Sequence, residues 1–235
     1  MQPRILCIDS ASTLCSVAVC GFQKDIQLVS LPEEKHTEVI LGMISELMRE
    51  AGAEFANLDA VAFGAGPGAF TGLRVACGTA QGLGWALEKP LVAVRNLEAM
   101  AVAALKDSDV GTKVFVAVDA RMNECYCAAF EKTADGVVCT VEEHLLKPET
   151  IVAAVKEHAD GFCCGNAFTV YPEARADDLR IAEGIDVADA TMLMPLASKA
   201  FTENRTVSAE TAAPLYVRNN VAMTIEERKL KGFKA

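Results

Sequence analysis

The sequence predicts an α/β fold built from two similar lobes, because the same order of predicted elements occurs twice along the chain. Each half shows three strand-like segments, then a helix, a further strand and more helical sequence. An aspartate ends the first strand of each half, Asp9 and Asp119, and a cysteine follows at the same separation, Cys15 and Cys125. With 235 residues and 51% hydrophobic content, the chain is long enough to bury the cores of two lobes.

The elements of the first half follow from changes in hydrophobic pattern. Three apolar segments read as strands, and apolar residues then recur with a helical period from Thr37 onward. A short apolar segment and a long segment of small residues complete the half. The predicted elements are strands over 4–9, 14–22 and 25–30, a helix over 37–51, a strand over 58–63 and a helix over 72–87.

The second half repeats this order after a short connection. A strand over 91–94, a helix over 96–106 and a polar linker over 106–111 join the halves. Strands over 113–119, 124–132 and 137–143, a helix over 148–158, a strand over 161–164, less regular helix and a charged surface segment over 171–189 follow. Such a duplication is the plan of the actin, hexokinase and Hsp70 superfamily, in which two ribonuclease-H-like lobes face a cleft. The expected domains are a first lobe over 1–106, a second lobe over 107–205, and a C-terminal strand and basic tail over 206–235 that packs back on the first lobe.

A glycine-rich turn before the predicted helix 72–87 is the most distinctive motif of the chain. Its sequence is Gly64-Ala65-Gly66-Pro67-Gly68-Ala69-Phe70-Thr71-Gly72-Leu73-Arg74. Glycine permits backbone angles that other side chains forbid, and Thr71 is expected to cap the helix. Amides at a helix N-terminus attract phosphate. However, no Gly-Lys-Ser/Thr follows, and the partial match to a dinucleotide fingerprint contains Pro67 and lacks an acidic ribose partner, so the turn is a weak nucleotide signal.

The same turn closely resembles the Gly-Pro-Gly-Ser-Phe-Thr-Gly-Leu-Arg signature of the TsaB family. The signature residues of this chain are Gly66, Pro67, Gly68, Phe70, Thr71, Gly72 and Arg74. The resemblance spans almost the whole chain, through segments at 5–18, 35–38, 119–126 and 214–222. Two departures are small: Ala69 stands where the family usually has serine, and Asn123 where it usually has glycine.

The resemblance implies a non-catalytic scaffold subunit that is required to form N6-threonylcarbamoyladenosine (t6A) at position 37 of tRNAs reading codons that begin with A. In the family, this subunit pairs through first-lobe helices with a homologous catalytic subunit, TsaD, and activates it, and a small ATPase, TsaE, docks on the pair. The resemblance therefore implies TsaD and TsaE as partners and contact with tRNA only through the complex. It implies no cofactor in the isolated chain, and ATP or ADP only at an interface shared within the complex.

The two predicted helices of the first lobe have surfaces suited to contact with another helix. Apolar residues spread widely around the helix 37–51. In the helix 72–87 glycines recur at four-residue intervals, although glycine in a helix costs about 0.5 to 1 kcal/mol relative to alanine. The alternative is that these glycines pack against the sheet of their own lobe. A helix-on-helix interface is favoured, with a homologous partner or with a second copy when the chain is alone. The expected interface residues are His36, Leu41, Met48, Gly78, Gly82 and Ala86.

Asp9 and Asp119 stand where nucleotide-binding members of the superfamily hold magnesium and phosphate. With Ser10 and Ser12 they make up the vestigial phosphate site that the sequence allows. Neither turn has the glycine that lets phosphate approach the backbone, so a degenerate site is favoured over an intact one. The alternative for both aspartates is turn formation, because Asp side chains accept hydrogen bonds from nearby amides. An active actin-fold kinase or a metal-dependent peptidase is the rival function.

Histidine and cysteine spacing gives no support for a metal centre, so neither a metal nor a catalytic residue is expected. The three histidines lack His-x-x-x-His spacing, and no Cys-x-x-Cys pair occurs. Most of the nine cysteines lie in apolar segments, which is typical of small core residues in a reducing compartment. These cysteines are Cys7, Cys15, Cys20, Cys77, Cys125 and Cys127.

Charge argues against tRNA binding by the chain alone, because its net charge is −10 and nucleic-acid affinity comes mostly from lysine and arginine. The C-terminus is the exception, because basic residues outnumber acidic ones there. This basic tail is expected to contact RNA or an acidic partner, and the alternative is a terminus that is simply solvated. Its basic residues are Arg218, Arg228, Lys229, Lys231 and Lys234. The sequence shows no membrane-spanning run and no signal peptide, so a cytoplasmic location is expected.

Overall fold

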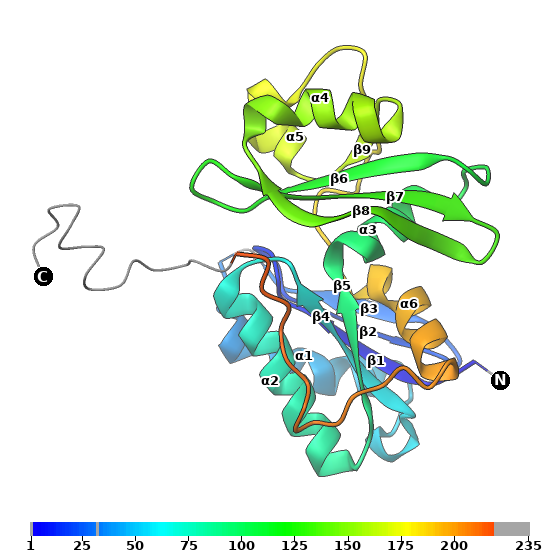
Figure 1. Cartoon of the computed structure of the whole chain (residues 1–235). Helices are drawn as coiled ribbons and strands as arrows, with labels where there is room; N and C mark the ends of the chain where they lie inside the picture. Colours follow the sequence, from blue (N-terminus) through cyan, green and yellow to red (C-terminus); the bar gives the residue numbers. More distant parts are fainter. Residues whose placement is uncertain (1, 32, 219–235) are drawn as a thin grey trace, which may run out of the picture.

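The computed structural model describes residues 2–31 and 33–218, which form two five-stranded sheets with helices on both faces of each (Figure 1). The first sheet has the order β3-β2-β1-β4-β5 and the second the order β10-β9-β6-β7-β8. Read from opposite edges, the two orders are the same. In each sheet the first three strands of the half pair antiparallel, and the remaining strands pair parallel. The predicted duplication is therefore confirmed at the level of strand order.

The strand bounds lie close to the predicted ranges. The first sheet contains β1 (Ile5–Asp9), β2 (Ser16–Cys20), β3 (Ile26–Val29), β4 (Ala60–Gly66) and β5 (Leu91–Arg95). The second contains β6 (Lys113–Asp119), β7 (Cys125–Thr133), β8 (Gly136–Leu146), β9 (Phe162–Cys164) and β10 (Arg180–Ile181). The helices are α1 (His36–Glu50), α2 (Phe70–Leu87), α3 (Asn96–Ala104), α4 (Pro148–Ala159), α5 (Ala167–Val170) and α6 (Ala190–Thr202), with short 3₁₀ turns at Phe55–Asn57 and Pro172–Ala174.

Two hydrophobic cores cover the two faces of the first sheet. Helices α1 and α2 pack on one face, where Ile8, Val17 and Phe63 are fully buried. Helix α6 packs on the other face, against Cys7, Ala62 and their neighbours. The long apolar segments of β1 and β4 follow from this burial on both sides, because a strand covered on both faces needs no polar alternation.

The structure differs from the expected domain division in two helices. Helix α3 lies within the range 1–106 but packs on the second sheet, where Leu97, Met100 and Leu105 join its core. Helix α6 lies within the range 107–205 but packs on the first sheet. The two helices also contact each other, so they fill the space between the sheets (Figure 1). Helices α4 and α5 cover the outer face of the second sheet.

After α6 the chain returns along the first sheet as an irregular segment that we name the C-terminal strap, residues 206–218. The expected C-terminal strand does not form in these residues, apart from one isolated bridge between Val207 and Leu91. The amide of Leu215 donates to the carbonyl of Ala65 at 2.7 Å, and the side chain of Gln81 donates to the carbonyl of Ala212. The strap therefore packs on β4 and α2. The basic residues Arg228, Lys229, Lys231 and Lys234 lie outside the described residues.

No helix among the described residues is long and apolar enough to cross a bilayer.

The cysteines of the apolar segments behave as the sequence predicts. Cys7, Cys15 and Cys20 are fully buried in the first half of the chain, and Cys125 and Cys127 in the second sheet. Burial raises the pKa of each of these thiols, so they remain protonated core residues at neutral pH.

Candidate functional site

The glycine-rich turn is anchored to β1 by a buried polar network around Asp9. The Asp9 carboxylate accepts a hydrogen bond from the Asn96 side chain at 2.6 Å and one from the Ala11 amide at 3.1 Å. The Asn96 side-chain oxygen in turn accepts from the Gly66 amide at 2.8 Å. Asp9 and Asn96 are both almost completely shielded from water. The network therefore links β1, the first residue of α3 and the start of the turn.

Two glycines of the signature are required for different reasons. Gly66 has φ +121°, a backbone conformation that L side chains rarely adopt. Gly72 has ordinary helical angles, but a Cβ there would run into the carbonyl oxygen of Ser10. The Ser10 hydroxyl also donates to the Gly72 carbonyl at 2.7 Å. Glycine is therefore needed at Gly66 for its backbone conformation. At Gly72 it is needed because the start of α2 lies directly against the backbone that follows β1.

Thr71 does not cap the helix, so that prediction was wrong. Helix α2 begins two residues earlier than expected, at Phe70, and its N-cap is Ala69 with no side-chain hydrogen bond. The position that would supply a capping hydroxyl is therefore the one at which this chain departs from the family signature.

Ala69→Ser is expected to stabilise the chain by about 1 kcal/mol, because a serine at the N-cap accepts a hydrogen bond from an otherwise unpaired amide of the first turn. Urea unfolding of the two proteins measures the difference. Ala86→Ser, at an exposed position inside the same helix, is the matched control and should not stabilise. Equal free energies of unfolding for Ala69→Ser and the wild type would contradict the capping account.

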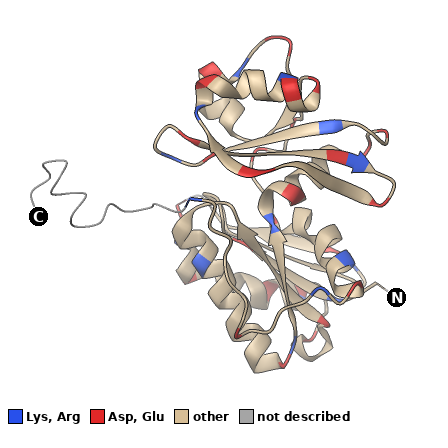
Figure 2. Cartoon of the chain, in the orientation of Figure 1, with Lys and Arg blue, Asp and Glu red and all other residues tan. Residues whose placement is uncertain are grey.

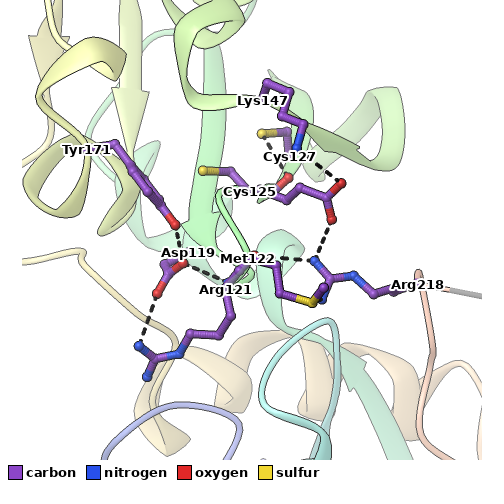
Figure 3. Close-up of polar contacts among 9 residues, drawn as sticks. Asp119, Arg121, Met122, Cys125, Cys127, Lys147, Tyr171 and Arg218 are labelled. Carbon is purple, nitrogen blue, oxygen red and sulfur yellow. Dashed lines mark hydrogen bonds and ion pairs between the residues drawn. The ribbon is translucent and has the colours of Figure 1, made fainter. Parts of the chain in front are cut away.

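The Asp119 side chain occupies the equivalent place in the second sheet and forms a turn of the same kind. Its carboxylate accepts from the Arg121 amide at 2.7 Å, as Asp9 does from Ala11, and also from the Tyr171 hydroxyl at 2.8 Å (Figure 3). The Asn166 side chain accepts from the Asp119 amide. The turn-forming alternative that the sequence leaves open for both aspartates therefore describes their hydrogen bonds in this structure.

The four residues of the expected phosphate site are not brought together on one surface. Ser12 and Asp119 line a cavity of about 130 Å³ between the sheets, together with Pro67 and Gly68. Asp9 and Ser10 are completely buried and do not line this cavity. Small-molecule sites usually measure about 300 to 1,000 Å³. The cavity at this cleft is therefore smaller than a site for a nucleotide.

Burial raises the pKa of the Asp9 carboxyl from 3.8 to about 7, despite the hydrogen bonds from Asn96 and Ala11, which favour the charged form. Glu143, between the sheets on β8, behaves similarly. Its side chain is 3% exposed, and burial raises its pKa from 4.5 to about 7 despite the charge of Arg95 at 3.4 Å. Each carboxyl must lose a buried proton when the pH rises through neutrality.

The free energy of unfolding is expected to fall by about 2 to 4 kcal/mol between pH 5 and pH 8. In the unfolded chain both carboxyls ionise near pH 4, whereas in the folded chain Asp9 and Glu143 stay protonated until about pH 7. The folded state therefore binds more protons in this window, and stability decreases as the pH rises. Urea unfolding at several pH values measures it. Glu143→Gln, which cannot ionise, should show a smaller decrease, and an unchanged slope in that variant would exclude Glu143 as a source.

The exposed face of α2 carries three of the six expected interface residues, Gly78, Gly82 and Ala86. Phe70, Arg74, Gly78, Gly82 and Ala86 follow one another at four-residue spacing and so lie along one face of the helix, and all five are exposed. A Cβ built on Gly78 or Gly82 would meet nothing within 4 Å. These two glycines therefore do not pack against the sheet of their own half. Arg74 is the single charged residue of α2 (Figure 2).

The other expected interface residues divide between surface and core. Leu41 on α1 is 61% exposed. His36 is half-buried at the start of α1, with a ring nitrogen 3.3 Å from the carbonyl of Thr13. Met48 is 2% exposed and packs in the core with Ile44, so its assignment to an interface was wrong. It lies one helical turn after Ile44 and therefore faces the sheet.

Some residues of these sites were not predicted from the sequence. Asn96 joins Asp9 to the turn, and its place directly after an apolar strand was the available signal. Tyr216 of the strap packs against Phe70, with ring centroids 5.5 Å apart and ring planes tilted by 36°, and its hydroxyl accepts a hydrogen bond from Arg74 at 3.0 Å. The Arg74 guanidinium lies 3.9 Å from the Phe70 ring centre. Among the described residues, no cluster of three histidine, cysteine, aspartate or glutamate side chains is arranged to hold a metal ion.

Comparisons with known proteins point in one direction. The family model described as "TsaD: tRNA N6-adenosine threonylcarbamoyltransferase" matches residues 30–226. The chain is 34% identical over 223 residues to the Escherichia coli (strain K12) protein named tRNA threonylcarbamoyladenosine biosynthesis protein TsaB, which covers 93% of this chain and 96% of that one. The solved structure of YeaZ from Pseudomonas aeruginosa is similar with a TM-score of 0.79 and 31% identity, over 91% of this chain and 99% of that one. A tRNA N6-adenosine threonylcarbamoyltransferase of Syntrophobacter fumaroxidans is 41% identical over 86 residues, 37% of this chain and 25% of that protein.

Proposed function

The chain belongs to the TsaB family and serves threonylcarbamoyladenosine biosynthesis in tRNA, and we propose that it does so as a subunit that supplies a docking surface and no catalytic group. The single observation that carries this proposal is the glycine ridge of α2. Gly78 and Gly82 each cost the helix about 0.5 to 1 kcal/mol relative to alanine, yet open space surrounds both of them. No contact within the chain requires glycine at these two positions, because a larger side chain would fit there. Close approach of a helix from a second protein would require it.

The partner proposed for this ridge is a TsaD-type catalytic subunit, which modifies position 37 of tRNAs that read codons beginning with A. The match of the TsaD family model supports a homologous partner, since homologous helices can pair face to face in a pseudo-symmetric dimer. In the absence of that partner, the same face is proposed to pair with a second copy of the chain. Recruitment of the ATPase TsaE rests on the family resemblance alone.

The absence of a catalytic role is supported by the hydrogen bonds of the two aspartates. Asp9 is buried, and both of its oxygens accept hydrogen bonds from the chain itself. Asp119 accepts from an amide and from Tyr171. Neither carboxylate points to an open site of the size that a kinase needs. The equal strand order of the two sheets supports the actin, hexokinase and Hsp70 superfamily as the origin of the fold, with the phosphate site lost.

ATP or ADP is proposed to bind only at an interface shared within the complex. A hollow of about 380 Å³ lies where α1 and α2 begin, lined by Ser12, His36, Thr37 and Thr71 among others. Hydroxyl groups and helix amides are suited to phosphate, and a partner on α2 would supply the remaining wall. A cytoplasmic location is proposed because it is consistent with a role in tRNA modification.

Reconstitution of the modification tests the proposal. The catalytic homologue, the ATPase subunit and tRNA are combined with or without this chain, and t6A is quantified by mass spectrometry of the nucleosides. Modification should require the chain and should survive Asp119→Asn, which removes a carboxylate charge at the cleft. Equal modification without the chain would refute a role as a required subunit, and loss of modification in a folded Asp119→Asn variant would refute the non-catalytic role.

A further inference from the structure

The C-terminal strap connects the two sheets through a single arginine. Along its length the strap contacts the first sheet and α2, through Val207, Ala212, Leu215 and Tyr216. Its last described residue, Arg218, turns away to the second sheet. There the guanidinium pairs with the Glu124 carboxylate at 2.6 Å, with the arginine side chain only 14% exposed. The strap thus runs along the first sheet and α2 (Figure 1), and the Arg218 side chain at its end reaches the turn between β6 and β7.

Arg218 makes several contacts at its destination (Figure 3). Its guanidinium donates to the Arg121 carbonyl at 3.4 Å and lies 3.5 Å from the Met122 sulfur. Lys147 approaches Glu124 from the other side at 3.8 Å. The Arg218 Nε is buried and finds no partner among the described residues. The arginine therefore exchanges hydration for one close carboxylate and one carbonyl, which makes its placement dependent on Glu124.

The turn that receives Arg218 has an unusual backbone. Residues Arg121, Met122 and Asn123 all have positive φ, +64°, +57° and +56°. Positive φ is uncommon for non-glycine residues, although asparagine adopts it more readily than most, and three such residues in a row are held by the contacts around them. Two backbone hydrogen bonds close this turn, from the Ala120 amide to the Glu124 carbonyl at 2.9 Å and from the Glu124 amide to the Arg121 carbonyl at 3.2 Å. The Asp119 carboxylate binds the Arg121 amide, and Arg218 donates to the Arg121 carbonyl. Arg218 is therefore the contact that the strap adds to a turn that its own backbone and Asp119 also hold.

The strap also closes the cleft beside the signature turn. A cavity of about 160 Å³ is bounded by Pro67 to Phe70 of the signature turn, by Ala120 and Arg121 of the second sheet, and by Leu215 to Arg218 of the strap. It shares walls with the smaller cavity that Asp119 lines. If the end of the strap moved away, the cavity of about 160 Å³ would open along this side.

We propose that the Arg218–Glu124 pair is a latch that fixes the angle between the two sheets and keeps the cleft over the signature turn closed. Release of Arg218 removes the contact between the strap and the turn 120–124 and lets the second sheet move relative to the first. Because the remaining chain continues directly from Arg218, a partner that engages residues beyond 218 would act on the latch. This regulatory contact does not depend on which partner binds α2.

The distance between the sheets tests the latch. Spin labels are placed on introduced cysteines at Ser45 of α1 and Ala153 of α4, both exposed, and the distance distribution is measured by electron resonance. A sample without introduced cysteines measures labelling of the native thiols. The wild type should give one narrow distribution. Arg218→Gln and Glu124→Gln should each broaden it at least twofold or shift its mean, and Arg218→Lys, which keeps the charge, should retain most of the narrow population.

A matched control and a double variant distinguish a specific effect of the Arg218–Glu124 pair from a general effect of removing an arginine from the surface. Arg205 also follows α6 and pairs with a carboxylate, Glu203, at 2.7 Å, but within its own segment. Arg205→Gln should leave the distribution unchanged. The double variant Arg218→Gln with Glu124→Gln should match either single variant, because both remove the same contact. Unchanged distributions in folded Arg218→Gln and Glu124→Gln, or equal broadening in Arg205→Gln, would overturn the proposal.

Discussion

Gly72→Val is expected to lower the free energy of unfolding by at least about 3 kcal/mol. The new Cβ would meet the Ser10 carbonyl oxygen, which belongs to the backbone at the end of buried β1 and cannot turn aside. Overpacking of a buried site costs about 1 to 3 kcal/mol and occasionally more, and a clash with fixed backbone belongs at the upper end of that range. Urea unfolding followed by circular dichroism measures the loss.

Gly78→Val is the matched control for this prediction. It makes the same substitution on the same helix, but a Cβ at Gly78 meets nothing within 4 Å. Because valine has a better helix propensity than glycine, this variant should be as stable as the wild type or slightly more so. Similar losses in the two variants would show that the signature glycines act through helix propensity and not through contact with β1.

Gly82→Arg is expected to weaken pairing with the catalytic homologue about a hundredfold while the chain stays folded. An arginine on a closely packed helix face either holds the partner away or leaves a charge buried without a partner, which costs about 3 kcal/mol or more. Since Gly82 is exposed and has no neighbour within 4 Å, the isolated variant should unfold at the same temperature as the wild type or above it. Calorimetric titration against the partner measures the affinity.

Ala153→Arg is the control for the added charge. Ala153 is exposed on α4, on the outer face of the second sheet, so this variant introduces arginine on a helix far from α2. Its affinity for the partner should equal that of the wild type. If Gly82→Arg pairs as tightly as Ala153→Arg, the interface does not include the glycine ridge.

Much of the fold could be predicted from hydrophobic pattern, since each strand and long helix produces its own local periodicity. The packing of α3 and α6 could not. Residues Leu97, Ala99, Met100 and Ala101 make α3 apolar around most of its circumference, so its sequence does not indicate which sheet it faces. Helix α6 lies far along the chain from the first sheet that it covers, and no local pattern records that distance.

The candidate site shows the same limit. The sequence indicates Asp9, Asp119 and the glycine turn because each is a local motif, and it indicates the glycine spacing of α2 for the same reason. Met48 was misassigned because a wide apolar stripe does not show where the core ends and the surface begins. The Arg218–Glu124 pair joins residues that are 94 positions apart, and an ion pair of that separation leaves no sign in one sequence.

The measurement that tests the central claim most directly is t6A formation in the reconstituted system with three forms of this chain: wild type, Gly82→Arg and Ala153→Arg. If the chain contributes through the α2 surface, the wild type and Ala153→Arg should support equal modification, and Gly82→Arg should fall to the level found without the chain. Full modification with a folded Gly82→Arg variant would contradict the account.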